Sequence, residues 1–496
     1  MSKQRTNTLS KSTLIRGLQC QKSLYLYKNA FHQRDKTDKV QQQKFDRGHR
    51  VGLLARALFP NGRDLTPPTA FAFDQSIAAT QALIGMQIPV LYEATFKYHG
   101  VLVALDILVL KDGKWYGYEV KSSFRVTKTY LLDAAIQYNI ITKSGLPLED
   151  FSIIHINNEY VKNGDLDIHK LFKITSVKED VIERQAFITE TIENAIQTLS
   201  SETIPEVPIG KQCFKPYPCD FQRTCWKNIQ ESEIFRVGGL NLDEKIDLYL
   251  NDKLTLKDIP EEYMERERVK IQTEALKENG PILKREAFKA FLDKVNYPLY
   301  FFDLEAFQPA IPLYENTAPF QNIPFQLSLH YKASETAPMM HYEYICDGKY
   351  DPRREFLDTF LRLTEQPGQI VVYNTLMEEG ILNQLKALFP EKMDDVNERI
   401  GRFVDLETPF KMNWYYHPDM QGAYSLKAIL PTLVPGAHYE DFEIKDGLEA
   451  LAVFDELIYE TDAAKISYWR THLLEYCKMD TYGLSQVYAA LKRLLA

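Results

Sequence analysis

Two carboxylates interrupt an apolar run near residue 300. The segment YFFDLEAF (300–307) places Asp303 and Glu305 two positions apart among aromatic and aliphatic side chains. Because strand side chains alternate between faces, both acids are expected on one face of a buried strand. Two buried carboxylates repel each other unless a cation lies between them. The pattern favours a divalent metal site over an edge strand with solvated acids, which the flanking aromatic residues contradict.

The segments that must position these acids follow the order βββαβα. Three strand-like segments (300–307, 324–332 and 341–348) precede a helix that starts from an Asp-Pro signal, a short strand and a second helix. That order is typical of a ribonuclease H-like core. With an Asp-x-Glu pair in its first strand, the sequence resembles the DEDD (DnaQ-like) 3′–5′ exonucleases. The resemblance implies an exonuclease domain over residues 296–496.

The same resemblance implies the remaining residues of this site. YNTLMEEGIL resembles the second motif, with Glu378 as the acid in place of the usual Asp and Glu379 as an alternative. EYCKMDTYGL resembles the third motif in its Tyr form (DEDDy), with Tyr476 and Asp480 on one face of a helix. Together with Asp303 and Glu305, these acids would hold two metal ions about 4 Å apart, and Tyr476 would orient the attacking water.

A hairpin is predicted in an earlier segment, VLVALDILVLKDGKWYGYEVKSS (101–123). Asp112-Gly113 is a strong signal for a two-residue turn between two strand-like runs. With this turn, Lys111 faces Lys114, and the numbers of paired residues sum to 225. The hairpin therefore fixes which side chains of the two strands are neighbours.

This register places Asp106 directly opposite Glu119, with Lys121 on the same face. Two acids and a lysine could bind a divalent ion, orient a water and stabilise charge on a phosphate. An exposed face with ordinary charges is the alternative. Asp106 argues against it, because this residue interrupts a run that otherwise reads as buried.

These residues resemble the PD-(D/E)XK nucleases, in particular the RecB-like branch that includes AddB and CRISPR-associated exonucleases. YEVKSS matches the Glu-x-Lys element, and Glu93 resembles an acid that often accompanies it. The family's helix with Gln and a nearby Tyr corresponds to DAAIQYNII, which supplies Gln137 and Tyr138. Many members also carry a His four residues after a Gly, and here Gly52 stands at that place.

Cysteines cluster after this region. Cys213, Cys219 and Cys225 have five residues between neighbours, and Cys20 is the only other cysteine in the first half of the chain. Clustered cysteines in a cytosolic chain favour metal over disulfides. The one-plus-three layout resembles AddB-type nucleases, which implies an iron–sulfur cluster, of the 4Fe-4S type. Zinc and reduced buried thiols are the alternatives. Cys346 and Cys477 are expected in the core.

Composition and charge bound the class of protein. The chain has 496 residues, of which 45% are hydrophobic and 26% charged, and a net charge of −9, which argues against a generic nucleic-acid coat. Residues 1–56 carry thirteen Lys or Arg against three Asp, which predicts a solvated helical surface or a phosphate-contacting one. No apolar run approaches the roughly 18 residues of a membrane span. With no secretory h-region visible, a cytoplasmic protein without membrane contact is expected.

An α/β fold with two nuclease domains is therefore expected. A RecB-like PD-(D/E)XK domain with the cysteine cluster covers 1–230, a helical connector covers 231–295, and the DEDDy exonuclease-like domain covers 296–496. The predicted activity is hydrolysis of DNA single strands or duplex ends with Mg²⁺ or Mn²⁺, in repair, defence or CRISPR-related processing and alongside other DNA-processing proteins. Two alternatives stay open. The first is a nucleic-acid-binding protein with degenerate sites, which the departures from the family motifs at Gly52 and Glu378 favour. The second is an RNase D-like enzyme that acts on RNA.

Overall fold

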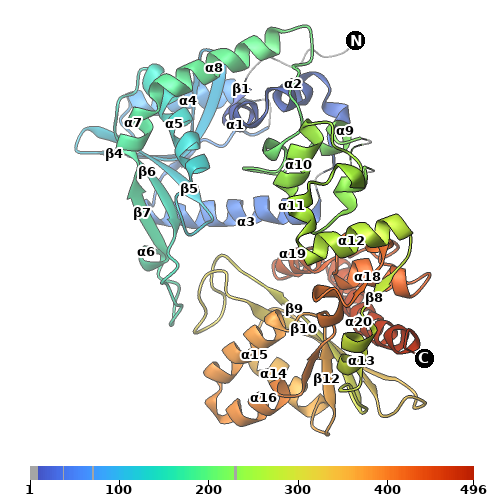
Figure 1. Cartoon of the computed structure of the whole chain (residues 1–496). Coiled ribbons are helices and arrows are strands. Elements are labelled where there is room, and N and C mark those ends of the chain that lie inside the picture. The colour runs from blue at the N-terminus through green and yellow to red at the C-terminus, as the bar shows by residue number, and fades with distance from the viewer. Residues whose placement is uncertain (1–8, 37, 70–71, 228, 230–231, 496) are drawn as a thin grey trace. The chain divides into compact units, whose positions relative to one another are not determined.

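The chain folds into two compact units. The computed structural model describes residues 9–36, 38–69, 72–227, 229 and 232–495, and its fold is mixed α/β (Figure 1). The first unit comprises Met1–Lys227 and Pro309–Phe320, and the second comprises Asn228–Gln308 and Gln321–Ala496. Among the described residues, no helix combines the length and the apolar character that a membrane crossing requires.

A seven-stranded sheet forms the centre of the first unit. Its order is β2-β3-β4-β5-β6-β7, with β1 parallel to β4. Strands β3, β4 and β5 form an antiparallel meander, and β6 is parallel to β5. The strands are β1 (Leu9–Ser10), β2 (Arg63–Asp64), β3 (Val90–Tyr98), β4 (Val101–Lys111), β5 (Lys114–Lys121), β6 (Leu148–Ile156) and β7 (Phe172–Ser176).

Helices cover both faces of this sheet (Figure 1). An apolar core with Leu14, Ile136 and Ile188 joins α1, α5 and α8 to one face, and Val51 and Ala55 of α3 pack against the other. The helices are α1 (Lys11–Gln19), α2 (Gln21–Asn29), α3 (Lys39–Ala55), α4 (Phe73–Gly85), α5 (Lys128–Lys143), α6 (Ile168–Leu171), α7 (Lys178–Glu183), α8 (Gln185–Ser200) and α9 (Gln222–Cys225).

The β4–β5 hairpin has the predicted register. Asp112 and Gly113 have φ values of 53° and 73°, the left-handed conformations that a tight hairpin turn of this kind needs at both central residues. Lys111 pairs with Lys114, and the ladder continues to Ile107 with Tyr118. The hairpin prediction from sequence is confirmed.

Residues 309–320 belong to the first unit, although sequence reasoning placed them in the C-terminal domain. Ala310 joins the apolar core on the α3 face of the first sheet. The ring of Phe320 meets that of Phe124 edge-on at 5.0 Å, and Lys162 Nζ lies 2.9 Å from a carboxylate oxygen of Glu315. Apolar burial thus holds this segment, which connects two strands of the second unit, within the first unit.

A five-stranded sheet forms the centre of the second unit, in the order β11-β10-β9-β12-β13. Strand β10 is antiparallel to β9 and β11, whereas β9, β12 and β13 run parallel. The predicted element order βββαβα is the one found from β9 to α15. The strands of this sheet are β9 (Leu299–Phe307), β10 (Ile323–Lys332), β11 (Met340–Ile345), β12 (Gln369–Val372) and β13 (Phe403–Asp405). Strands β8 (Ile282–Leu283) and β14 (Tyr415–Tyr416) form a separate two-stranded sheet.

Alternation along β9 separates the apolar core from the acids. Phe302 and Leu304 join the core formed with α14 and α15, so Asp303 and Glu305 face the opposite side, where α20 packs. The helices are α10 (Leu242–Leu250), α11 (Glu261–Met264), α12 (Glu267–Glu278), α13 (Arg285–Leu292), α14 (Arg353–Leu363), α15 (Leu376–Leu388), α16 (Met393–Ile400), α17 (Thr408–Lys411), α18 (Leu426–Leu433), α19 (Gly447–Leu457) and α20 (Ala463–Arg493).

The segment expected as a connector, 231–295, is helical but belongs to the second unit. Ile234, Leu248 and Val269 are among the residues of a small apolar core of its own. Gly238 lies so close to Gly422 that a Cβ at residue 238 would come within 2.0 Å of the Gly422 carbonyl oxygen. Only glycine fits such an approach, so this segment packs tightly against the rest of its unit.

Candidate metal centres

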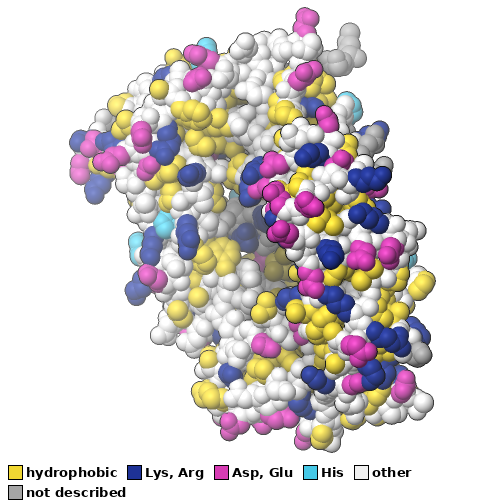
Figure 2. All heavy atoms as spheres, in the orientation of Figure 1, with side chains coloured by type: hydrophobic (Ala, Val, Ile, Leu, Met, Phe, Trp, Pro, Cys, Tyr) yellow, Lys and Arg dark blue, Asp and Glu magenta, His cyan; other side chains and the backbone are white. Residues whose placement is uncertain are grey.

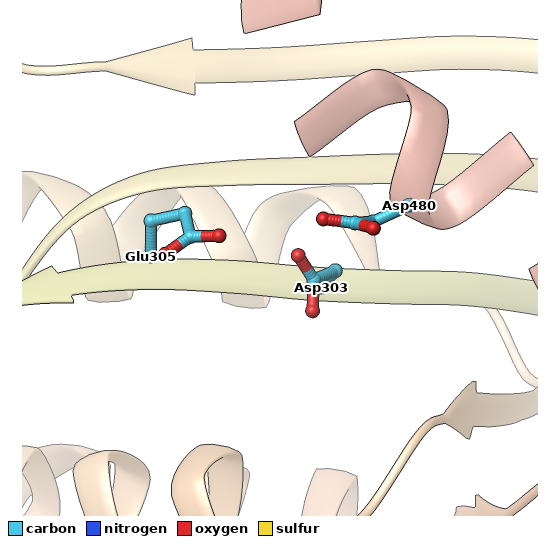
Figure 3. A group of neighbouring side chains, drawn as sticks. All are labelled: Asp303, Glu305 and Asp480. Carbon is cyan, nitrogen blue, oxygen red and sulfur yellow. The ribbon is translucent and has the colours of Figure 1, made fainter. Parts of the chain in front are cut away.

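Three carboxylates converge in the second unit. One oxygen each of Asp303, Glu305 and Asp480 lies within 4.8 Å of the other two (Figure 3). Strand β9 supplies the first two side chains and helix α20 supplies the third (Figure 3). Oxygen ligands at such spacing suit Mg²⁺ or Mn²⁺. The motifs in the sequence predicted this meeting, although Asp480 lies 175 residues after Glu305 along the chain.

The electrostatics of this group are those of acids without a counter-ion. Burial raises the pKa of Asp303 well above its ordinary value, and the negative charges of Asp480, Glu305 and Glu378 raise it further. The pKa of Glu305 is raised in the same way by burial and by Asp480. Burial also raises the pKa of Asp480. A divalent cation would relieve this repulsion, so the donor set fits a metal ion.

Glu378 borders this group from the first turn of α15. Asn374 takes a left-handed conformation (φ 67°) after β12, and its backbone N–H donates to Asp405 at 2.9 Å. Asparagine tolerates this conformation, and helix α15 begins two residues later. Glu378 is buried, its Oε2 has no hydrogen-bond partner among the described residues, and burial raises its pKa to about 8. Glu379 is partly exposed, so Glu378 is the better candidate ligand.

Tyr476 precedes Asp480 by four residues on α20, and its hydroxyl accepts a hydrogen bond from a lysine. The Lys427 ammonium donates to Tyr476 Oη at 2.9 Å and lies 4.7 Å from the centre of its ring. Lys427 also lowers the pKa of Glu305 and Asp480 against the larger effect of burial. This lysine, in the segment GAYSLKAIL, supplies a positive charge at the site that sequence reasoning did not assign.

Two further side chains contact the acids. Tyr439 donates a hydrogen bond to Asp480 Oδ1 at 2.6 Å. Cys477 is buried, as expected from the sequence, yet its Sγ lies 3.5 Å from Asp303 Oδ2. Tyr439 lies in a loop without a motif, so no sequence signal pointed to it. Cys477 adjoins Tyr476 in the third motif, and its place could have been suspected from that.

Three acids form a row across the first sheet. The β4–β5 ladder ends at Ile107 with Tyr118, so the next pair in this register is Asp106 with Glu119. The β3–β4 ladder has a gap that corresponds to Glu93 opposite Asp106. The backbone N–H of Val120 donates to Asp106 Oδ2 at 2.6 Å. Beyond burial, the charges of Glu119 and Glu93 raise the pKa of Asp106, so these three carboxylates from neighbouring strands lie near one another.

The Glu93 backbone is strained at this row. Its φ of 55° is unusual for a residue with a branched or long side chain inside a strand. Such conformations concentrate at functional sites. The Glu93 carboxylate lies 3.4 Å from an Arg56 nitrogen, so this acid has a cationic partner of its own.

Two lysines neutralise the buried end of the row. Lys11 Nζ and Lys121 Nζ lie 2.6 and 2.7 Å from the same oxygen of Glu119. Lys121 also forms an ion pair with Asp133 of α5, and Lys11 lies 3.5 Å from this carboxylate. Sequence reasoning assigned Lys121 but missed Lys11 and Asp133. Asp133 stands four residues before Gln137, a helical spacing that could have revealed it.

Charge balance in this site is uneven. Burial opposes ionisation of Glu119, but Lys11 and Lys121 outweigh burial and hold its pKa far below the ordinary value. Burial and then Glu119 raise the pKa of Asp106 well above normal. Burial lowers the pKa of Lys121, but the neighbouring carboxylates outweigh it and raise that pKa.

Several buried polar atoms of this site have no hydrogen-bond partner among the described residues. They are Glu119 Oε2, Asp133 Oδ1 and both amide atoms of Gln137, which is fully buried. Buried polar groups in folded proteins are nearly always satisfied, so unpartnered atoms mark a place for water or an ion. Glu119 Oε2 is therefore an available oxygen ligand for a divalent ion beside Asp106, although within the described residues three carboxylate, histidine or cysteine ligand atoms converge within 4.8 Å only at Asp303, Glu305 and Asp480.

The four predicted cysteines line one cavity of the first unit. Cys20, Cys213, Cys219 and Cys225 all border it, together with Lys22 and Ser23. All four thiols are free. Cys20 is the N-cap of α2 and accepts the Ser23 N–H at 3.4 Å. Burial raises the pKa of both Cys20 and Cys225.

Polar contacts hold the cysteine segment to the N-terminal helices. Arg16 and Arg34 both pair with Asp220, the residue after Cys219. Gln19 Nε2 donates to the backbone carbonyls of Gln212 and Tyr217, each at 2.6 Å. Some basic side chains of residues 1–56 therefore form ion pairs within the unit. Neither a solvated surface nor a phosphate-contacting surface explains the position of every basic residue in this segment.

Charged side chains of both signs are interspersed on the face shown in Figure 2. Dark blue and magenta groups of the described residues lie next to each other over much of this view (Figure 2).

Comparison with known proteins adds one similarity. Residues 300–425 match a family model described as Domain of unknown function (DUF2779). The matched stretch begins on β9 and includes Asp303, Glu305 and Glu378, but it ends before Lys427 and Asp480. A search of curated proteins finds no match.

Proposed function

We propose that this protein is a metal-dependent nuclease whose second unit removes nucleotides from the 3′ end of a nucleic acid strand. The observation that carries the proposal is the convergence of Asp303, Glu305 and Asp480, with Glu378 at the border of the group. Strand order and orientation in the second sheet support a ribonuclease H-like core, since β9, β10 and β11 form an antiparallel meander and β12 and β13 add in parallel.

The carboxylates would hold Mg²⁺ or Mn²⁺, which supplies a metal-activated water and neutralises charge on the phosphate. Around them, this chain's own residues orient and balance the site. Tyr439 fixes one oxygen of Asp480, and Lys427 fixes the hydroxyl of Tyr476. Burial of Glu305 and Asp480 excludes water from the acids, which strengthens their interactions with any cation. In this proposal Tyr476 positions the water that attacks the phosphate.

DNA is the substrate favoured by the resemblance of the first unit to RecB-like nucleases. In that unit Asp106, Glu119 and Lys121 form a second hydrolytic site, with Gln137 beside it. Two unpartnered groups support this role: an oxygen of Glu119 and the side-chain amide of Gln137, which have no hydrogen-bond partner among the described residues. Both can bind an ion or a water. Lys11 and Lys121 both form ion pairs with Glu119 and so compete with a metal ion for its oxygens. These ion pairs favour the alternative, an inactive site that only binds nucleic acid.

An iron–sulfur cluster completes the proposal for the first unit. Cys20, Cys213, Cys219 and Cys225 would be its ligands, and zinc is the alternative. The common cavity supports a shared ligand set, and the one-plus-three cysteine layout favours a cluster by its resemblance to AddB-type nucleases. Such a cluster would join residue 20 to residues 213–225 and stabilise the folded unit.

Digestion of matched DNA and RNA strands tests the activity. A single strand of each, of the same sequence and labelled at its 5′ end, is incubated with the protein and Mn²⁺ or with EDTA. The proposal predicts Mn²⁺-dependent shortening of the DNA strand from its 3′ end. Shortening of RNA alone would favour the RNase D-like alternative, and binding of both strands without cleavage would favour degenerate sites.

A further inference from the structure

Glu119 of the first unit pairs with one more cation than a Glu-x-Lys element supplies. Lys121 belongs to that element and lies on β5 between Glu119 and Asp133. Lys11 comes from a distant part of the chain, the first turn of α1, and reaches the same two carboxylates. The hydroxyl of Ser10 caps this helix and fixes where its first residue lies.

The contacts of Lys11 explain how the fold tolerates the buried carboxylates of Glu119 and Asp133 without a metal ion. The side chains of Glu119 and Asp133 are only 3% and 9% exposed, and a buried carboxylate without a cation is strongly destabilising. Lys11 and Lys121 together supply two positive charges for these two negative ones. In the ion-free site the chain itself therefore neutralises Glu119 and Asp133.

The two lysines differ in the element that holds them. Lys121 is 17% exposed and extends from a central strand, with its ammonium 5.3 Å from the centre of the Tyr130 ring. Lys11 is 26% exposed and lies at a helix end, where its ammonium pairs with the two carboxylates. Lys11 has a flexible stem and belongs to a helix, so a movement of its ammonium needs no change in the strands of the sheet.

We propose that Lys11 is a built-in competitor of the divalent ion at Glu119. It neutralises Glu119 and Asp133 in the ion-free state, withdraws when Mg²⁺ or Mn²⁺ binds, and so sets the ion concentration at which the first unit loads. The inference rests on the metal-binding part of the proposed function, and it concerns regulation of that same site. An ammonium and a divalent ion cannot share the Glu119 oxygens at close range, because their like charges repel.

Manganese binding by a lysine variant tests the competition. The full chain carrying Asp303→Asn, which weakens ion binding in the second unit, is compared with the same chain carrying also Lys11→Met. Mn²⁺ affinity is measured by titration calorimetry, and melting temperature is measured in EDTA and in Mn²⁺. We expect Lys11→Met to lower the melting temperature in EDTA, to bind Mn²⁺ about tenfold more tightly or better, and to regain stability in Mn²⁺.

Two matched variants separate charge from fold. Lys114→Met removes an exposed lysine paired with Glu149 and should change neither property. Lys11→Arg keeps the charge and should keep the weak Mn²⁺ affinity. If Lys11→Met does not fold, Lys11→Gln takes its place in the comparison with Lys11→Arg.

The outcomes are distinct. Equal or weaker Mn²⁺ binding by the neutral variants, with a lower melting temperature in both buffers, would overturn the competition and leave Lys11 a structural residue. Absence of Mn²⁺ binding to the first unit in parent and variants alike would overturn the metal site itself, and the role of Lys11 with it. Cleavage by the second unit bears on neither result.

Discussion

The Tyr439 hydroxyl donates a 2.6 Å hydrogen bond to Oδ1 of Asp480 and thereby orients one of the three converging carboxylates. The contact joins a loop between α18 and α19 to the long helix α20. It lowers the pKa of Asp480 against the larger effect of burial, so it favours the ionised form that a metal ion needs.

Removal of this hydroxyl should weaken the site without disrupting the fold. Tyr439→Phe keeps the ring but removes one of the two tyrosine hydroxyls that hydrogen-bond to Asp480, and a hydrogen bond to a charged group contributes about 1.5–3 kcal/mol. We expect cleavage to fall about tenfold or more and the Mn²⁺ concentration for half-maximal activity to rise. Tyr482→Phe, an exposed residue on the same helix, is the control. Wild-type kinetics in Tyr439→Phe would contradict the role of the contact.

Repulsion among the acids predicts a variant that is more stable than wild type without metal. Asp303→Asn removes one of the converging charges, so the melting temperature in EDTA should rise. The same variant should lose most of the stabilisation that Mn²⁺ gives to the second unit. Asp394→Asn, on the exposed side of α16, should behave as wild type in both buffers. A lower melting temperature in EDTA for Asp303→Asn would show that other contacts of Asp303 outweigh the repulsion.

The pKa of Glu378 predicts the pH dependence of stability. Its pKa is about 8 in the folded chain against an ordinary 4.5, so the folded state holds a proton that the unfolded state releases. This stabilisation is complete below pH 4.5 and is lost as the pH rises towards 8, at up to about 1.4 kcal/mol per pH unit. Urea unfolding in EDTA from pH 5 to 8 should therefore show falling stability.

Glu378→Gln should flatten that slope, because the amide does not ionise. Burial raises the pKa of Asp303 and Glu305 in the same direction, so part of the slope should remain. Glu379→Gln, at the neighbouring and partly exposed position, should retain most of it. Equal slopes in wild type and Glu378→Gln would mean that Glu378 ionises normally.

The common cavity of the four cysteines predicts a coloured protein. After anaerobic purification the chain should be brown and contain iron and acid-labile sulfide, and Cys219→Ser should lose the colour and destabilise the first unit. Cys346→Ala, in the second unit, should keep the colour. One equivalent of zinc without iron would contradict the cluster and leave a zinc site in its place.

Local patterns in the sequence predicted the parts of the fold that depend on neighbouring residues. The turn at Asp112-Gly113 fixed the β4–β5 register, and alternation in YFFDLEAF placed Asp303 and Glu305 opposite the apolar core. The i, i+4 spacing of Tyr476 and Asp480 gave their shared helix face. Each of these inferences uses only backbone geometry within one element or one hairpin.

Long-range contacts without a motif could not be read in this way. Lys11 reaches Glu119 across 108 residues, and Tyr439 reaches Asp480 from an irregular loop. Residues 309–320 pack into the first unit through Ala310 and Phe320, which look like ordinary loop residues in the sequence. Such contacts depend on tertiary packing, which spacing along the chain does not encode.

Digestion of a 5′-labelled single strand by wild type, Asp303→Ala and Asp106→Ala tests the central claim most directly. If Asp303, Glu305 and Asp480 form the 3′–5′ exonuclease centre, Asp303→Ala abolishes metal-dependent shortening from the 3′ end and Asp106→Ala retains it. If shortening survives in Asp303→Ala and vanishes in Asp106→Ala, the activity belongs to the first unit and the assignment of the second unit is wrong.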